Sequence, residues 1–270
     1  MLYDSTADVI RKALRGLDMA PSDAAAQAGL PEREVLAASR GKVDGELLRK
    51  LAAPLGLDAE ALAGLPAYWP PPCPLAEVRG LELPFDDETV NAWLIEDGRG
   101  GHVVFDAGDG RLDLRRALED LGIREVDVLI THAHGDHTGG LAGLGDMARS
   151  VAGPAGFEER VKPGDELSRG ALSIRVIDLP GHCPGALGYV VTGLGVPLCV
   201  TGDALFAGSM GGCGPGEPYR EALDALRAAV MSLPDETVLL TGHGPESTVG
   251  SEKRGNVFLA GAGREPVPAA

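Results

Sequence analysis

Short apolar runs, each followed by a polar stretch that contains glycine, recur along the second half of the chain. Runs of this length between glycine and polar residues are typical of buried strands that end in loops. The four clearest runs are residues 126–130, 174–179, 196–200 and 238–240. Each is followed within a few residues by a histidine or an aspartate, so the pattern predicts polar side chains at four strand ends.

The other patterns in this part of the chain alternate between strand-like and helix-like periodicity. Three strands are expected between residues 77 and 108, a short strand at 150–152 and a hairpin-like pair at 161–179. Helices are expected at 113–121, near Leu141 and at 219–232. Two runs of strands separated by helices predict a mixed α/β fold in which helices cover sheets.

The first 65 residues have a different pattern, because they are rich in Ala and Leu and lack strand-like runs. Helices are expected at 22–28, 31–39 and 46–55, with a turn at Gly29 and Leu30 between the first two. This arrangement resembles the phage-repressor type of helix-turn-helix, whose second helix enters the DNA major groove. Residues 1–65 are therefore expected to form a small all-α domain.

The charges of this helical region disfavour DNA binding. It holds eight Lys or Arg residues and ten Asp or Glu residues, a net charge of −2, and its second helix carries Glu32 and Glu34. Phosphate binding needs clustered basic residues. The expected roles of the region are packing, dimer formation or control of access to an active site.

Five prolines in the stretch from Leu65 to Pro74 prevent a helix or a central strand there. Residues 66–74 are therefore expected to be a stiff linker. The predicted organisation is a helical domain at 1–65, this linker, and an α/β domain at 75–270.

Composition and charge narrow the functional classes. The chain has 270 residues and a formal net charge of −16, which argues against nucleic acid as the main partner. It has no apolar stretch of about 18 residues and no signal-peptide pattern, so neither a membrane partner nor export is expected and the predicted location is cytoplasmic. Four cysteines without CxxC spacing predict reduced thiols rather than a disulfide framework.

The stretch Thr-His-Ala-His-Gly-Asp-His at 131–137 has the composition of a metal site. His132 and His134 are two residues apart, so both imidazoles leave the same face of an extended chain. Asp136 and His137 follow the turn at Gly135 and can aim at a neighbouring point. A lone histidine is more often structural than a ligand, but this density suggests two metal ions.

Three further candidates stand after the other apolar runs, namely His182, Asp203 and His243. Strand ends are where side chains distant in sequence converge in sheets covered by helices, so four such ends can build one site. His102 lies before a strand and outside this order, and a structural role is expected for it.

These residues carry a close family resemblance. The motif at 131–140 with its three downstream candidates resembles the metallo-β-lactamase superfamily, and the resemblance covers about residues 75–260. The stretches TGDALFAGSMG and LPDETVLLTGHGPESTVGSEKRGNVFL are similar to glyoxalase II-like hydrolases of bacteria. The resemblance implies an αββα sandwich, two sheets with helices outside.

The resemblance also implies a ligand set and a mechanism. His132, His134 and His182 would hold one metal, Asp136, His137 and His243 a second, and Asp203 would bridge them, with Asp136 also counted as catalytic. The expected cofactors are two Zn2+ ions per chain, with iron or manganese as alternatives. A shared metal-bound hydroxide would attack a carbonyl group of a small-molecule substrate.

Three functions remain open at this point. The first is hydrolysis of an acyl thioester, as in glyoxalase II. The second is a mononuclear iron persulfide dioxygenase, and the third is a DNA-binding regulator with a metallohydrolase-fold sensor. Pro215 stands where a glutathione-binding Lys would follow in the family, and no further helical domain is expected after Phe258, so glutathione is not assigned as the carrier. A homo-oligomer is compatible with the sequence.

Overall fold

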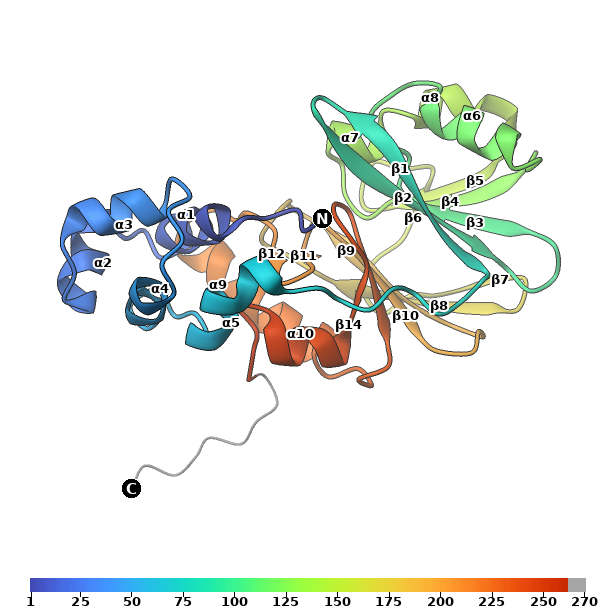
Figure 1. The fold of residues 1–270 in the computed structure, drawn as a ribbon. Coiled ribbons are helices and arrows are strands. Elements are labelled where there is room, and N and C mark those ends of the chain that lie inside the picture. Colours follow the sequence, from blue (N-terminus) through green and yellow to red (C-terminus); the bar gives the residue numbers. More distant parts are fainter. Residues whose placement is uncertain (262–270) are drawn as a thin grey trace.

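Two six-stranded sheets face each other in the computed structural model, which describes residues 1–261 (Figure 1). The last nine residues of the predicted α/β domain, 262–270, lie outside the described residues. The first sheet has the order β1-β2-β3-β4-β5-β6, with antiparallel pairs up to β3 and parallel pairs beyond it. Its strands are β1 (Val78–Phe85), β2 (Glu88–Glu96), β3 (His102–Phe105), β4 (Val126–Leu129), β5 (Ala148–Gly153) and β6 (Glu159–Arg160).

The second sheet has the order β14-β13-β10-β9-β8-β7. Strands β8 and β10 are both antiparallel to β9, and β13 is parallel to β10, so β8, β10 and β13 run in one direction. A separate short hairpin, β11 (Leu205–Phe206) with β12 (Ser209–Met210), follows β10. The sheet strands are β7 (Glu166–Arg169), β8 (Leu172–Asp178), β9 (Leu187–Thr192), β10 (Leu198–Gly202), β13 (Val238–Thr241) and β14 (Ser247–Thr248).

A hydrophobic cluster fills the space between the sheets. Phe105 of the first sheet packs against Tyr189 of the second, with 5.4 Å between ring centroids, among buried Val, Ile and Leu side chains. Strand β4 is buried along its whole length, whereas β8 alternates between buried and exposed residues near its start. These burial patterns follow from the continuous and alternating apolar positions of the two strands.

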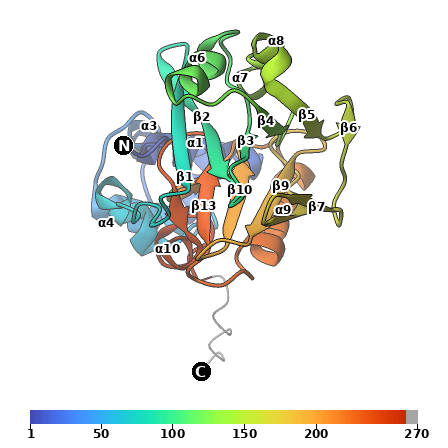
Figure 2. The same cartoon turned by 90° about the vertical axis from the view of Figure 1, so that its right-hand side faces the viewer.

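Helices cover the outer faces of both sheets, which confirms the predicted αββα sandwich. Helices α6 (Asp113–Asp120) and α8 (Leu141–Leu144) pack on the first sheet. On the second lie α10 (Val249–Gly255) and α9 (Glu217–Ala225), which continues through a π-helical turn at Leu226–Val230. Figure 2 shows the two sheets edge-on between these layers.

Five α-helices and a 3-10 turn at Leu65–Ala67 precede the first strand, and the predicted helices correspond to α2, α3 and α4. Their apolar faces share one hydrophobic cluster with the outer face of the second sheet, in which Leu48 and Leu51 lie with Val190 and Leu239. Figure 1 shows these helices extending from the sandwich on the side of α9 and α10. They are α1 (Thr6–Gly16), α2 (Pro21–Ala28), α3 (Glu32–Ala38), α4 (Gly45–Ala52) and α5 (Ala59–Gly64).

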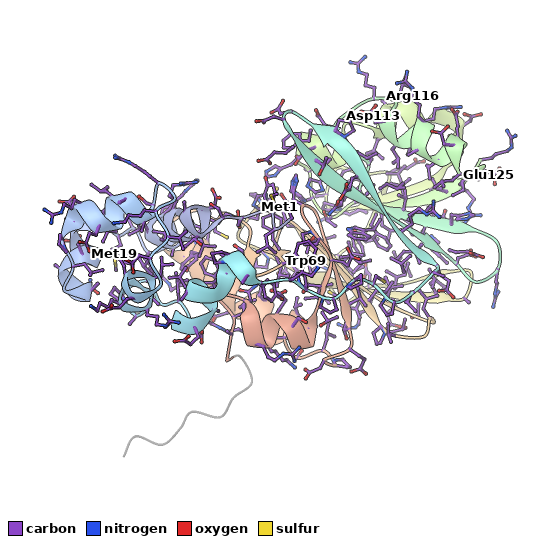
Figure 3. All side chains as sticks on the ribbon, viewed as in Figure 1. Met1, Met19, Trp69, Asp113, Arg116 and Glu125 are labelled. Atoms are coloured by element: carbon purple, nitrogen blue, oxygen red, sulfur yellow. The ribbon has the colours of Figure 1, made fainter. Side chains whose placement is uncertain are left out.

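The proline-rich segment after α5 is fixed to the sandwich at several points. Tyr68 donates a 2.6 Å hydrogen bond to Glu252, a fully buried carboxyl of α10. The backbone N–H of Cys73 donates to Glu246 at 3.0 Å. Trp69 between them is 75% exposed, and Figure 3 shows it on the extended segment between the helices and the sheets. Among residues 1–261, no helix has the length and apolarity needed to cross a membrane.

Candidate metal centre

All seven predicted site residues converge at one edge of the sandwich. They lie just beyond the ends of strands β4, β8, β10 and β13, two of them on the single-turn helix α7 (Gly135–Thr138). The structure groups them into two sets whose potential ligand atoms lie within 4.8 Å of one another. We call His132, His134 and His182 the first group, and Asp136, His137, Asp203 and His243 the second group.

The first group consists of three imidazoles whose ring nitrogens face one another. His134 Nδ1 lies 3.1 Å from His132 Nε2 and 3.1 Å from His182 Nε2. Ligands at the usual Zn–N distance in a tetrahedron lie about 3.4 Å apart, so this spacing is close to that of a zinc site.

The second group adds two carboxylates to two imidazoles. Asp136 Oδ2 lies 3.3 Å from His243 Nε2 and 3.5 Å from His137 Nε2. Asp203 joins the two groups, because its Oδ2 is 3.5 Å from both His182 Nε2 and His243 Nε2, and its Oδ1 is 3.2 Å from His137 Nε2.

Hydrogen bonds on the outer side of the rings fix which nitrogen faces inward. His182 Nδ1 donates to the Gly212 carbonyl at 3.0 Å, and His243 Nδ1 donates to the Thr89 carbonyl at 2.8 Å. His137 Nδ1 bonds the buried Asp106 carboxylate at 2.8 Å. Each bond leaves Nε2 to face the centre, which is how outer partners orient metal-binding histidines.

Thr131 orients His132 in a similar way. The Thr131 hydroxyl lies 2.9 Å from Asp106 Oδ2 and 2.9 Å from His132 Nδ1. Its single proton goes to the carboxylate, which can only accept, so the hydroxyl oxygen accepts from His132 Nδ1. Asp106 therefore supports both groups, directly at His137 and through Thr131 at His132.

Glycine is required where the chain passes the second group at Gly242. A β-carbon there would lie 2.0 Å from Asp203 Oδ1 and 2.8 Å from His137 Cε1. Neither atom can move without disturbing the centre, so any side chain at this position displaces a candidate ligand.

The two groups differ in their electrostatics. Burial lowers the pKa of His132 to about 4, and burial also lowers that of His182. Burial alone would lower the pKa of His243 too, but hydrogen bonds to Asp136 and Asp203 outweigh it and raise it to about 9. The imidazoles of the second group therefore hold protons against which a metal must compete.

The residues present fit divalent metal ions. Within residues 1–261, His137 Nε2 and Asp203 Oδ1 are buried and have no hydrogen-bond partner of suitable geometry, although they lie 3.2 Å apart. This arrangement is costly unless a cation satisfies both. Mixed imidazole and carboxylate donors suit zinc, and also iron or manganese.

Some supporting residues were not identified from the sequence. Asp106 follows an apolar strand and precedes Gly108, which is the same signal that marked the candidate ligands, and its backbone has a φ of +63°. The carbonyl groups of Thr89 and Gly212 carry no sequence signal at all. Their roles follow only from the fold.

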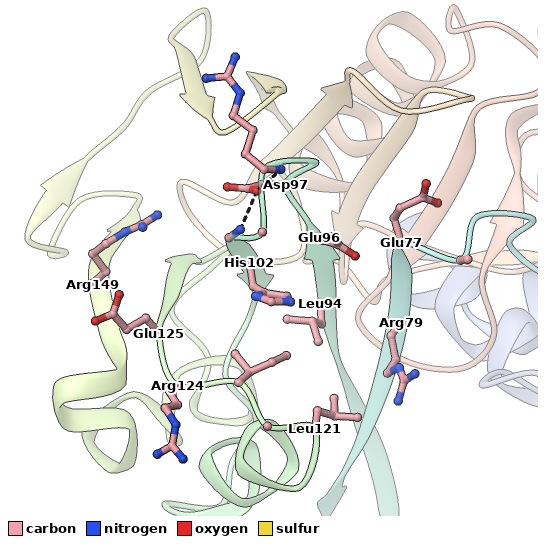
Figure 4. A pocket seen from close by; sticks show the side chains of 16 residues that line it. Glu77, Arg79, Leu94, Glu96, Asp97, His102, Leu121, Arg124, Glu125 and Arg149 are labelled. Atoms are coloured by element: carbon pink, nitrogen blue, oxygen red, sulfur yellow. Dashed lines mark hydrogen bonds between the residues drawn. The ribbon is translucent and has the colours of Figure 1, made fainter.

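The remaining candidates lie away from the centre or are enclosed. Cys183 and Cys213 are both buried, and burial raises the pKa of Cys213 to about 11. His102 begins β3 and lines a pocket of about 870 Å³ with Arg79 and Arg149, shown in Figure 4. This pocket contains none of the seven candidate ligands.

The chain was compared with known protein families and individual proteins. The model of the family described as "Metallo-beta-lactamase superfamily" matches residues 85–170. "Probable metallo-hydrolase YqgX" of Bacillus subtilis is 30% identical over 186 residues, and the match covers 59% of this chain and 87% of that protein.

Two further similarities concern an enzyme and a metal-bound structure. A hydroxyacylglutathione hydrolase of Albidiferax ferrireducens is 37% identical over 161 residues, covering 56% of this chain and 60% of that protein. This chain thus spans about three fifths of that relative's length. The crystal structure of TTHA1623 in a di-iron-bound form is 28% identical with a TM-score of 0.53, and the match covers 66% of this chain and 100% of that one.

Proposed function

The chain belongs to the metallo-beta-lactamase superfamily, and from that premise we propose that it is a dinuclear, metal-dependent hydrolase of acyl thioesters. The proposed ligands are the three histidines of the first group and the four residues of the second group, with Asp203 between the two metals. Zinc is the proposed metal in both positions.

The observation that carries this proposal is the position of Asp203. One carboxylate lies within 3.5 Å of ring nitrogens from both groups, so it can hold two cations at once. The di-iron form of the similar TTHA1623 structure supports two metals rather than one. The hydroxyacylglutathione hydrolase among the relatives supports a thioester as the substrate class.

Two divalent ions, when bound, would polarise a substrate carbonyl and lower the pKa of a water molecule. The chain's own residues prepare this chemistry by orienting the donors. Asp106 and the Thr89 carbonyl hold His137 and His243 with Nε2 inward. Asp136 is 12% exposed, the most exposed side chain of the second group, so its carboxylate can accept a hydrogen bond from water at the mouth of the centre.

Water, rather than a protein side chain, is the proposed nucleophile. Cys183 follows His182 directly and Cys213 follows Gly212, whose carbonyl bonds His182, and both cysteines are buried. The pKa of Cys213 is raised by burial to about 11, which keeps it in the unreactive thiol form at neutral pH. Hydrolysis would break the C–S bond and release a carboxylic acid and a thiol.

The test is a panel of acyl thioesters assayed with the purified protein while metal content is measured in parallel. Matched oxygen esters control for general esterase activity, and Asp203→Ala controls for contaminating hydrolases. Two zinc ions per chain with thioester turnover would support the proposal. One iron per chain with oxygen consumption on a persulfide would favour the mononuclear dioxygenase instead.

No nucleic-acid partner is proposed for the helices before β1, and the regulator hypothesis is set aside. The first turn of α3 carries Glu32 and Glu34, and the N-terminal 65 residues have a net charge of −2. Titration of random duplex DNA at low salt, where screening is weakest, is expected to show no binding. Tight binding that weakens steeply with added salt would restore the regulator hypothesis.

A further inference from the structure

The segment before the first helix reaches across the molecule to the metal centre. The ring of Tyr3 stacks on the imidazole of His243, with 4.5 Å between centroids and 16° between planes. Phe206 of β11 meets Tyr3 edge-on at 4.8 Å. Figure 3 shows neighbouring Met1 where the helical segment approaches the sandwich. A residue at the start of the described chain thus covers a candidate ligand 240 positions away.

The other polar contacts of His243 lie along the edge of its ring. Its Nδ1 bonds the Thr89 carbonyl at 2.8 Å and its Nε2 lies 3.3 Å from Asp136 Oδ2, and neither contact packs against a face of the ring. Phe85 lies 5.8 Å from it at 43° and Phe206 at 5.9 Å, both too distant and inclined for a parallel stack. Tyr3 is the ring that lies parallel to His243 among the described aromatic pairs.

Several contacts hold Tyr3 in place. The adjacent Asp4 is buried, accepts a 2.6 Å hydrogen bond from Ser209 in the β11–β12 hairpin and pairs with Lys12 of α1. Lys12 also donates to the Met210 carbonyl at 2.9 Å. These contacts fix helix α1 and the residue next to Tyr3 to the β11–β12 hairpin, which follows Asp203.

The backbone on the other side is shaped to receive Tyr3. A β-carbon at Gly244 would lie 3.0 Å from the Tyr3 backbone nitrogen and 3.1 Å from its β-carbon. Gly244 also has a φ of +69°, which a residue with a side chain rarely adopts. The chain next to His243 therefore passes directly under Tyr3.

We propose that Tyr3 is a positioning residue that holds the His243 ring in the orientation needed to bind the second metal, so that the N-terminal helical segment completes the metal centre. The proposal rests on the metal centre described above. It assigns the helices before β1 a role in building the active site through the anchored Asp4 and Lys12. It concerns metal binding and does not depend on which substrate is hydrolysed.

The test compares Tyr3→Ala, Tyr3→Leu and Tyr3→Phe with the unchanged protein. Zinc is removed and then titrated back in the presence of a chromophoric chelator, which gives the affinities of both sites without any substrate. Because outer partners of metal ligands are worth about 10- to 100-fold in affinity, Tyr3→Ala and Tyr3→Leu should weaken the second site by that factor. The first site should keep its affinity.

Tyr3→Phe keeps the stack and loses the hydroxyl, so it should bind both zinc ions as the unchanged protein does. Trp69→Ala, at an exposed aromatic residue of the proline-rich segment after α5, is the control and should leave both sites unchanged. Thermal unfolding of the metal-free variants identifies any variant that fails to fold. If Tyr3→Ala fails to fold, Tyr3→Leu still tests the proposal, because leucine keeps most of the packing volume.

Two results would overturn the proposal. If folded Tyr3→Leu or Tyr3→Ala binds the second zinc as tightly as the unchanged protein, the stack does not position His243. If Tyr3→Phe loses as much zinc affinity at the second site as Tyr3→Leu does, the hydroxyl of Tyr3 and not the stacked ring supports that affinity. A failure to hydrolyse thioesters would leave these affinities measurable, so it would reject the proposed function alone.

Discussion

The two ligand groups lie side by side but are built differently. The first group contains only imidazoles, and its member His134 is exposed at the surface. The second group combines imidazoles with two carboxylates and is buried apart from Asp136. Burial of neutral rings lowers the pKa of His132, whereas neighbouring carboxylates raise that of His243.

The difference indicates how each group is prepared for a metal. In the first group, burial lowers the pKa of His132 and of His182, so these two rings favour the neutral form that binds a metal. In the second group, neighbouring carboxylates raise the pKa of His243 and of His137 against the effect of burial, so protons compete with a metal there. Asp106, the Thr89 carbonyl and the ring of Tyr3 contact its imidazoles from distant parts of the chain.

The change expected to have the largest effect removes the residue that joins the groups. Asp203→Ala takes away the carboxylate shared by both metals, so both sites should lose metal and activity should fall by about 10³-fold or more. The fold should survive, because the side chain lies beyond the end of β10 and outside the hydrophobic clusters. Metal analysis and circular dichroism measure the two effects, and full activity in this variant would reject the dinuclear centre.

A steric change should break the second group while sparing the first. In Gly242→Ala the new methyl group would overlap Asp203 Oδ1 and press on His137, so affinity for the second metal should fall by about 100-fold. The matched control is Gly64→Ala, where a β-carbon meets nothing within 4 Å. Zinc titration distinguishes the sites. Equal losses in both variants would point to a general effect of removing glycine.

The candidate ligands of both groups could be predicted from the sequence, because local patterns mark them. The motif around His132 combines a buried strand with closely spaced donors, and the strand ends at His182, Asp203 and His243 repeat the same pattern. Parallel strands bring such ends together whatever the loops between them do. The αββα sandwich followed from these runs together with the family resemblance.

The long-range parts could not be predicted. The stack of Tyr3 on His243 and the bond from Tyr68 to Glu252 join residues far apart in the chain, and neither leaves a periodic signal. Asp106 looks like any other acid after a strand until the fold places it beside His137. The composition of the proline-rich stretch predicts that it is stiff, but it does not predict which surface of the sandwich the stretch contacts.

A milder change should weaken the second group without dismantling it. Asp136→Asn keeps the size of the side chain but removes its charge, so it should lower turnover by about 10- to 100-fold through weaker binding of the second metal. Stability of the metal-free protein should change little, because this side chain lies at the mouth of the centre and is partly exposed. Steady-state kinetics at saturating zinc and thermal unfolding measure the two effects. An unchanged rate would remove Asp136 from the proposed ligands.

A final expected effect is a difference in pH dependence between the two sites. In the metal-free protein His243 has a pKa raised to about 9, so zinc must displace its proton at neutral pH, and binding becomes tighter as pH rises. Displacing this proton should raise affinity at the second site by about tenfold per pH unit between 7 and 9. The pKa of His137, which Asp106 and Asp203 raise against the effect of burial, makes the slope steeper still. His132, with a pKa lowered to about 4, is already unprotonated over this range, so the first site should show a much flatter profile. Chelator competition at four pH values between 6.5 and 9.5 gives the affinity of each site as a function of pH. Equal slopes would mean that a metal displaces the same number of protons from both groups, which would contradict the prediction.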